Sequence, residues 1–94
     1  PYPAVREDLA VIVDEGVPAD AVAAVIRQAA GKLLVDLSLF DVYRGSQVGA
    51  GRKSLAWRLT FQAQDKTLTS EAAAGARGRI VAALTRDLGA ELRG

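Results

Sequence analysis

The sequence contains neither cysteine nor histidine. Without cysteine the chain cannot form a disulfide framework, a thiolate metal site or a sulfur nucleophile. Without histidine it lacks the commonest metal ligand and the side chain best suited to proton transfer near neutral pH. The separated carboxylates show no nucleophile–base arrangement. We therefore expect no catalytic residue, no metal site and no cofactor in this domain.

Long apolar runs and an excess of one charge are also missing. No run reaches the roughly 18 to 20 apolar residues that a membrane-spanning helix needs, and no stretch resembles a signal peptide. We expect a cytoplasmic protein that does not contact a membrane. Twelve basic side chains against eleven acidic ones leave a formal net charge of +1. Any binding of nucleic acid must then depend on local clusters of charge.

Aromatic side chains are scarce as well, because the 94 residues include one tryptophan, two tyrosines and two phenylalanines. Alanine, valine and leucine must fill most of the core, and a chain of this length supports one modest core. We therefore treat residues 1–94 as a single domain. The chain opens Pro-Tyr-Pro without a methionine, which indicates a piece excised from a longer polypeptide.

Two β-competent segments, residues 33–43 and 53–62, lie on either side of a glycine-rich connector. In the second segment apolar and polar residues alternate, which predicts a strand with one apolar and one polar face. We expect the two segments to pair as an antiparallel hairpin. In that hairpin Phe40 faces Trp57 and Val42 faces Leu55, and all four side chains are buried on one side.

The pleat of this hairpin sends a second set of side chains to the opposite, exposed side. The set combines an aromatic ring, a carboxylate, a hydroxyl, a small residue and a guanidinium, and it is our candidate binding site. Its members are Asp41, Tyr43, Ser54, Ala56 and Arg58.

The remaining patterns complete a recognisable order of elements. Residues 6–14 predict a central strand, residues 18–30 a helix ended by a left-handed Gly31, residues 70–88 a second helix capped by Thr69 and Gly89, and residues 90–93 a short closing strand. The order predicts an α+β, ferredoxin-like βαββαβ sandwich, in which two helices cover one face of a four-stranded antiparallel sheet. Many RNA-binding modules of this shape use the uncovered face.

The connector between the two segments carries a basic cluster, Arg44, Arg52 and Lys53. These cations, together with Arg58, are candidates for contacts with RNA phosphates, and a solvated cluster of charges is the alternative. The three connector glycines do not match a phosphate-binding P-loop. Tyr43 can equally be an aromatic that packs at the sheet edge, and the alternatives for Asp41 are a cap of the hairpin turn or an ion pair with Arg58 across the strands.

Several strings of the sequence resemble a known family. They are YPAVREDL (residues 2–9), LFDVYRG (39–45), GRKSLAWRL (51–59) with the following Phe61-Gln62, and TLT (67–69). These resemble the ferredoxin-fold anticodon-binding domain at the C-terminus of the phenylalanyl-tRNA synthetase beta subunit. The chain departs from that family at Glu7, where a basic residue is common, and at residues 72–75, which are less acidic and less bulky.

The resemblance implies a module that recognises the tRNA(Phe) anticodon and positions the tRNA for aminoacylation catalysed elsewhere in an ATP-dependent ligase. It implies that Asp41, Tyr43 and Ser54 meet the anticodon stem-loop. Its partners would be that tRNA and the remainder of the synthetase, the beta-subunit core and the alpha subunit. A small-ligand regulatory domain, with a site at the turn formed by residues 14–18, and a protein-docking domain are the alternatives.

Overall fold

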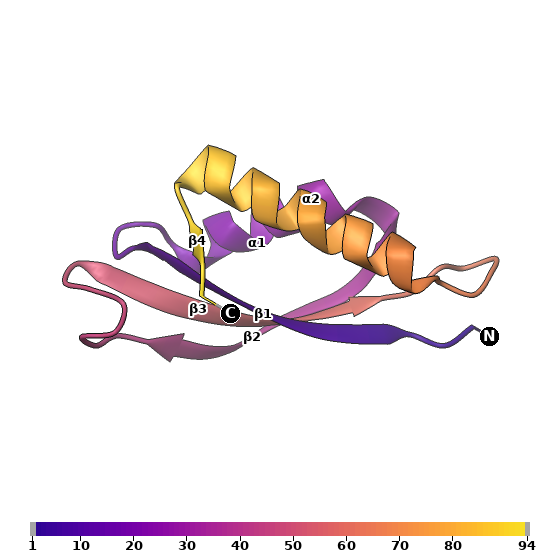
Figure 1. Ribbon diagram of the computed structural model, residues 1–94, viewed down its shortest axis with the longest axis horizontal. Coiled ribbons are helices and arrows are strands. Elements are labelled where there is room, and N and C mark those ends of the chain that lie inside the picture. Colours follow the sequence, from indigo (N-terminus) through magenta and orange to yellow (C-terminus); the bar gives the residue numbers. More distant parts are fainter. Residues whose placement is uncertain (1, 94) are drawn as a thin grey trace.

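The computed structural model describes residues 2–93 and contains six main elements. They are strand β1 (Val5–Asp14), helix α1 (Ala19–Ala30), strands β2 (Leu34–Tyr43) and β3 (Arg52–Phe61), helix α2 (Ser70–Leu88) and strand β4 (Glu91–Leu92). The strands form one antiparallel sheet in the order β2-β3-β1-β4. Both helices lie on one face of this sheet, and the other face is bare (Figure 1). The predicted ferredoxin-like α+β fold is confirmed.

The central position of β1 follows from its composition. Leu9, Val11 and Val13 are buried against the helices, while Ala10 and Ile12 occupy the opposite face. A strand with small or apolar residues on both faces suits an interior place in a sheet. β1 pairs with β3 along its whole length and with β4 over two residues, so the predicted central strand is confirmed.

A single hydrophobic cluster fills the space between the sheet and the helices. The strands supply leucine, valine, tryptophan and phenylalanine side chains, and the helices supply branched aliphatic side chains together with alanines. Trp57 is buried in this cluster, as predicted. The strand members are Leu9, Val11, Val13, Leu55, Trp57, Leu59 and Phe61, and the helix members include Val22, Ile26, Ala73, Ala76, Ile80 and Leu84.

Helix α2 is complete from its first turn, although Gly75 and Gly78 lower its intrinsic helix propensity. Thr69 caps the N-terminus as predicted, because its Oγ1 accepts a hydrogen bond of 3.1 Å from the backbone N–H of Ala72. Gly89 caps the C-terminus in a left-handed conformation, φ 63° and ψ 25°. At Gly31 the prediction is wrong in part: φ is 67° but ψ is −148°, and the chain continues into a short 3-10 turn.

The hairpin is confirmed, but its predicted register is wrong at Phe40. Two irregularities interrupt the pairing of β2 with β3, one between Leu34 and Asp36 and one between Leu39 and Asp41. The second inserts an extra residue, so Leu39 faces Trp57 and Phe40 lies on the uncovered side, 50% exposed. Val42 does face Leu55, yet it is 40% exposed because β2 is an edge strand.

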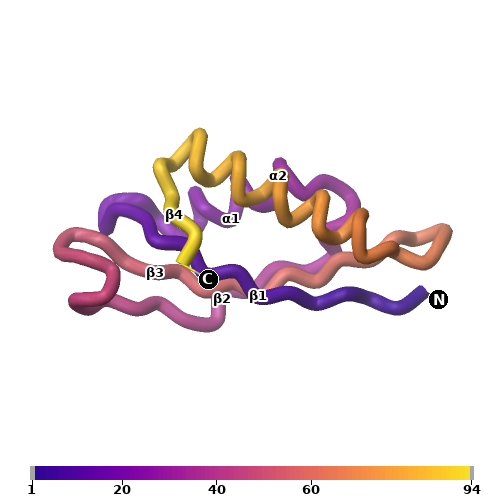
Figure 2. The backbone as a smooth tube through the Cα atoms, in the orientation of Figure 1, coloured from indigo at the N-terminus to yellow at the C-terminus, as the bar shows by residue number. Residues whose placement is uncertain are grey.

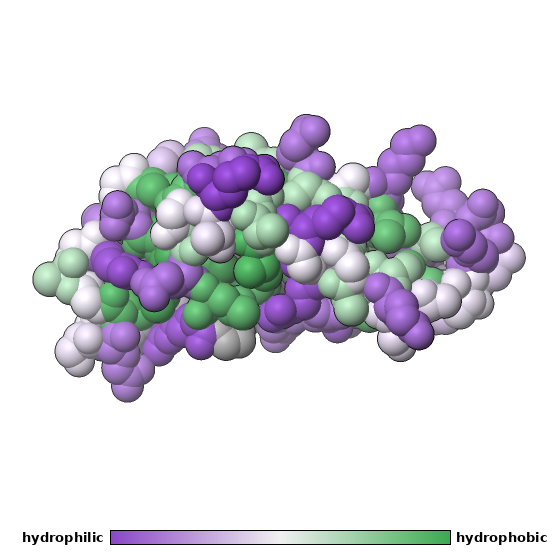
Figure 3. All heavy atoms as spheres, turned by 45° about the horizontal axis from the view of Figure 1, so that its top comes forward, coloured by the Kyte–Doolittle hydropathy of each residue, from purple (hydrophilic) through white to green (hydrophobic). Residues whose placement is uncertain are grey.

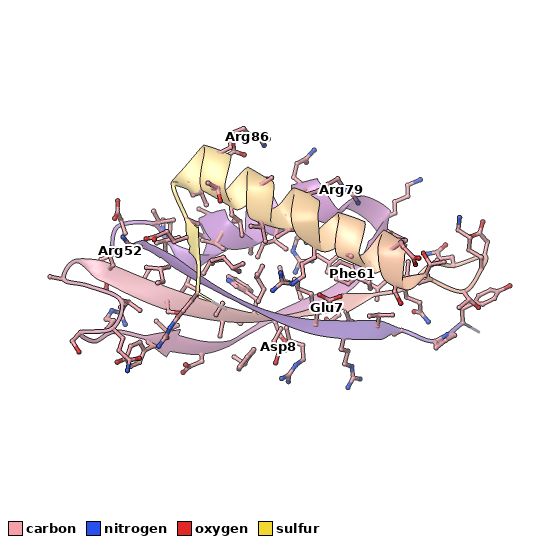
Figure 4. The ribbon with its side chains drawn as sticks, in the orientation of Figure 1. Glu7, Asp8, Arg52, Phe61, Arg79 and Arg86 are labelled. Carbon is pink, nitrogen blue, oxygen red and sulfur yellow. The ribbon has the colours of Figure 1, made fainter. Side chains whose placement is uncertain are left out.

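Neighbouring residues of β1 show how the pleat separates the two faces. Glu7 points toward α2, and Asp8 points away from the helices (Figure 4). Glu7 pairs with Arg77 of α2, with 3.2 Å between Oε1 and Nε. Glu7 therefore forms an ion pair with an arginine of α2.

The two ends of the sheet carry different connections. At one end the β2–β3 connector lies beside the turn between β1 and α1, and at the other end lies the connection from β3 to α2 (Figure 2). A hydrogen bond of 2.8 Å from the N–H of Glu15 to the carbonyl of Gly51 joins the connector to that turn. Within residues 2–93 no helix has the length and apolar character needed to cross a membrane.

Candidate nucleic-acid interface

The face of the sheet that carries no helix, hereafter the open face, brings the five candidate side chains together. Asp41 is paired with Ala56 and Tyr43 with Ser54 in the register of β2 and β3. Residues that face each other across two strands lie on the same side of a sheet. Arg58 is paired across β1 with Asp8, which points away from the helices (Figure 4). The predicted placement of all five on one side of the sheet is confirmed, but the expectation that all five are exposed is wrong at Ser54, which is buried.

Tyr43 is held between the connector and the end of the chain. A methyl group at Gly45 would overlap the end of the phenol ring, so a larger residue at this position would force the ring of Tyr43 to move. The guanidinium carbon of Arg93 lies 4.7 Å from the ring centroid. Arg93 also donates a hydrogen bond of 3.0 Å from Nη2 to Oε1 of Gln47. The phenol ring of Tyr43 therefore lies on the open face, as predicted, but the guanidinium of Arg93 lies against it.

Arg93 is a site residue that sequence reasoning missed. Its backbone N–H donates to the carbonyl of Ala10 on β1, while its side chain reaches the ring of Tyr43 on β2. Because β3 lies between β1 and β2, the side chain must cross the open face. Only the register of the two-residue strand β4 determines this crossing, and no pattern in the sequence specifies that register.

Ser54 is buried although it lies on the open face. It is flanked on the open face by Ile12 of β1 and Tyr43 of β2, and only 3% of its surface is exposed. Ala56, one pleat further along β3, is partly exposed. Ser54 is therefore scarcely accessible to a ligand on the open face, whereas Ala56, opposite Asp41, is partly accessible.

Arg58 is oriented by Asp8 on the adjacent strand. Nε donates to Oδ1 over 3.1 Å and Nη2 donates to Oδ2 over 3.3 Å. These hydrogen bonds raise the pKa of Arg58 above its ordinary value, so it stays charged. Its guanidinium carbon lies 4.8 Å from the centroid of the Phe40 ring. The alternative pairing of Arg58 with Asp41 is wrong.

Asp41 stands between these two arginine–aromatic pairs along β2. The structure of residues 2–93 shows no hydrogen bond or ion pair to its exposed carboxylate. A free carboxylate accepts hydrogen bonds only, so it suits the N–H groups on the edge of a base. Nowhere in residues 2–93 do three or more acidic side chains gather in a manner that could hold a metal ion.

The basic cluster of the connector is engaged with carboxylates of the same chain. Arg44 forms two hydrogen bonds with Glu15, one of them 2.9 Å from Nη2 to Oε2. Nζ of Lys53 lies 3.5 Å from the same carboxylate, and Arg52 pairs with Glu91. Lys53 is 8% exposed and lies opposite Val13, on the helix side. The structure does not bring Lys53 to the open face.

The same ion pairs lie at the turn formed by residues 14–18, which is the place expected for a small-ligand site in the alternative function. The Glu15 carboxylate, which follows β1, is bound by Arg44 and Lys53. Hydrogen bonding from Arg44, helped by the charges of Arg44 and Lys53, lowers the pKa of Glu15 from 4.5 to about 2. The turn is thereby tied to the β2–β3 connector by the chain's own charges.

We expect Glu15→Gln to lower stability at neutral pH and to leave it nearly unchanged near pH 2. A carboxyl with a depressed folded-state pKa stabilises the protein above its unfolded value of 4.5, and this stabilisation is lost as pH falls through about 2. The urea midpoints of both proteins, measured between pH 7 and pH 2, should converge as the pH falls. Because the pair is exposed, the difference should also shrink in salt. An equal difference at both pH values contradicts this assignment.

The helix side of the molecule presents a different surface. Helices α1 and α2 contain no aromatic residue. Hydrophilic side chains project over the helices, with hydrophobic areas between them (Figure 3). Arg86 points away from the sheet (Figure 4) and pairs with Asp87 of the same helix over 2.8 Å. Aromatic rings that lie against guanidinium groups occur in residues 2–93 on the open face.

Comparison with known proteins agrees with the fold and with the resemblance found in the sequence. Residues 1–93 match the family described as "Ferredoxin-fold anticodon binding domain". The chain is 50% identical over 94 residues to the phenylalanine–tRNA ligase beta subunit of Nocardia farcinica, covering 100% of this chain and 11% of that protein. It is 52% identical over 92 residues to the subunit of that name from Moorella thermoacetica, covering 98% and 12%. The chain thus spans about a ninth of the length of these relatives.

Proposed function

The chain belongs to the family of ferredoxin-fold anticodon-binding domains, and from this membership we propose that it binds the anticodon stem-loop of tRNA(Phe). The observation that carries the proposal is the open face, on which Tyr43, Asp41 and Arg58 are gathered without a covering helix. Single-stranded RNA is recognised by such faces, where unstacked bases lie on aromatic rings or guanidinium planes and hydrogen-bond through their edges.

Each side chain of the open face has a role in this proposal. Tyr43, with Arg93 on its ring, supports one unpaired base by stacking. Asp41 accepts a hydrogen bond from a base N–H, which suits the edge of a guanine. Ala56 allows a flat base to approach the sheet, and Ser54 exchanges a hydrogen bond with the RNA once the side chains around it move aside.

The arginines at the connector end supply charge. Arg44 follows Tyr43 at the end of β2, and Arg52 is the first residue of β3, two residues before Ser54; both are partly accessible in their ion pairs. In the proposed complex they exchange a carboxylate for an RNA phosphate. Lys53 is buried on the helix side with Glu15, and we assign it no contact with RNA.

Within the proposed parent protein, the domain positions tRNA(Phe) for a reaction carried out elsewhere. Its relatives are beta subunits of phenylalanine–tRNA ligase that are about nine times longer. The proposed partners are accordingly the tRNA, the rest of the beta subunit and the alpha subunit, in the cytoplasm. Binding through the open face needs no cofactor, and ATP and phenylalanine act in other domains.

The test is a comparison of two RNA hairpins that share one stem. One carries the anticodon loop of tRNA(Phe), and the other carries an unrelated loop of the same length. Stacking tolerates any base, whereas the Asp41 carboxylate accepts a hydrogen bond only from a suitable base edge. Because a hydrogen bond to a charged group contributes about 1.5 to 3 kcal/mol, we expect the tRNA(Phe) loop to bind at least about tenfold more tightly in a fluorescence-anisotropy titration. Equal affinity for the two loops, or no binding of either, contradicts the proposed function.

A further inference from the structure

We infer that Phe40, Arg58 and Asp8 form a second base-binding position on the open face, which takes another unpaired nucleobase of the loop that Tyr43 contacts. This inference rests on the proposed function. It assigns to Arg58 the role of a stacking surface, in place of the phosphate contact that its charge alone would suggest, and it adds Phe40 and Asp8 to the site.

The β-bulge between Leu39 and Asp41 is the first observation. The extra residue places Phe40 on the open face beside Asp41, and its ring is 50% exposed. Leu39 faces Trp57 on the helix side, so the alternation of the strand turns Phe40 to the open face, and the bulge then keeps Asp41 on that same face. The chain therefore presents a second aromatic ring on the strand that carries Tyr43.

The second observation is the way Arg58 is held. Asp8 binds Nε and Nη2 through both of its carboxylate oxygens, so the guanidinium is fixed in orientation and its charge is balanced. A guanidinium whose charge is offset by a bound carboxylate attracts a phosphate only weakly, but its flat surface remains available for stacking. The Arg58 side chain is 47% exposed and lies over the Phe40 ring. A base can therefore reach this planar surface from solvent.

The third observation is that an arginine lies against an aromatic ring of β2 at two places on the open face. Arg93 lies 4.7 Å from the Tyr43 ring centroid, and Arg58 lies 4.8 Å from that of Phe40. The two rings are three residues apart on β2, or about 10 Å at 3.3 Å per residue. Stacked nucleotides are only about 3.4 Å apart. The two positions therefore suit two unstacked bases of a loop, with the free carboxylate of Asp41 between them.

The experiment uses anticodon stem-loops of tRNA(Phe) that carry 2-aminopurine at one loop position at a time. The fluorescence of this base falls when it stacks on a protein side chain. With the unmodified protein we expect two loop positions to respond on binding. Phe40→Ala and Arg58→Lys should each abolish the response at one of them and weaken binding roughly 5- to 150-fold, the range expected for one lost stack. The response that depends on Tyr43 should persist.

Arg58→Lys separates stacking from charge, because lysine retains the positive charge and lacks the plane. The salt dependence of binding should therefore stay unchanged in this variant. Arg86→Lys is the matched control, since Arg86 is also an exposed arginine paired with an aspartate, but on the outer side of α2. It should alter neither fluorescence response.

Two outcomes overturn the inference in distinguishable ways. If Tyr43→Ala removes one response while Phe40→Ala and Arg58→Lys leave every response and the affinity unchanged, the second position does not exist and the proposed function stands. If no loop position responds and no binding is detected with the unmodified protein, the proposed function fails, and the second position fails with it. The urea midpoint of each variant shows that the fold is retained.

Discussion

Replacement of Tyr43 by alanine is expected to weaken binding of the tRNA(Phe) anticodon stem-loop by roughly 5- to 150-fold, equivalent to about 1 to 3 kcal/mol for one lost base stack. The ring lies opposite Ser54 and two residues from Asp41 on the open face. Its removal also leaves the guanidinium of Arg93 without the surface on which it lies. Fluorescence anisotropy with a labelled stem-loop measures the change directly.

Tyr2 provides a matched control for this substitution. It is the other tyrosine of the chain, 40% exposed, and it precedes the end of β1 that pairs with Phe61, far from the connector. Tyr2→Ala should leave the affinity within about twofold of the unmodified protein, since no part of the proposed interface includes it. Equal losses in both variants, or no loss in Tyr43→Ala with the fold retained, contradict the assignment of Tyr43.

Replacement of Leu59 by alanine is expected to lower the free energy of unfolding by about 2 to 5 kcal/mol. Leu59 lies on β3 between Trp57 and Phe61 on the helix side and is fully buried. The loss combines the transfer free energy of the removed methyl groups with the cost of the cavity left behind. Domains of this size are stable by only about 5 to 15 kcal/mol, so the urea midpoint should fall substantially.

Leu92→Ala removes the same atoms from an exposed place. Leu92 lies on the two-residue strand β4 and is about half exposed. This substitution should change the free energy of unfolding by less than about 1 kcal/mol, because few of its contacts are buried. Similar losses in the two variants would contradict the position of the core between the sheet and the helices.

The faces of the sheet could be predicted because β3 alternates without interruption. Leu55, Trp57, Leu59 and Phe61 have a period of two and point to the helices. The partners of Ser54 and Ala56 on β2 then follow from the position of the connector. Strong periodicity in one strand was thus enough to place Asp41, Tyr43, Ser54, Ala56 and Arg58 on one side.

The environment of that face could not be predicted in this way. The bulge at Phe40 depends on how β2 and β3 pair, and each strand alone is compatible with a regular ladder. The crossing of Arg93 depends on the pairing of a strand only two residues long. The ion pairs of Glu15 and Asp8 join residues 29 and 50 positions apart. Such contacts are determined by the tertiary arrangement and leave no periodic signal.

The central claim is that RNA contacts the open face, and backbone amide chemical shifts during a titration with the tRNA(Phe) anticodon stem-loop test it most directly. The largest shifts should map to residues 40–43 of β2, residues 54–58 of β3 and Arg93, with small shifts along α1 and α2. Shifts concentrated on the outer surfaces of α1 and α2, with β2 and β3 unaffected, would contradict the claim.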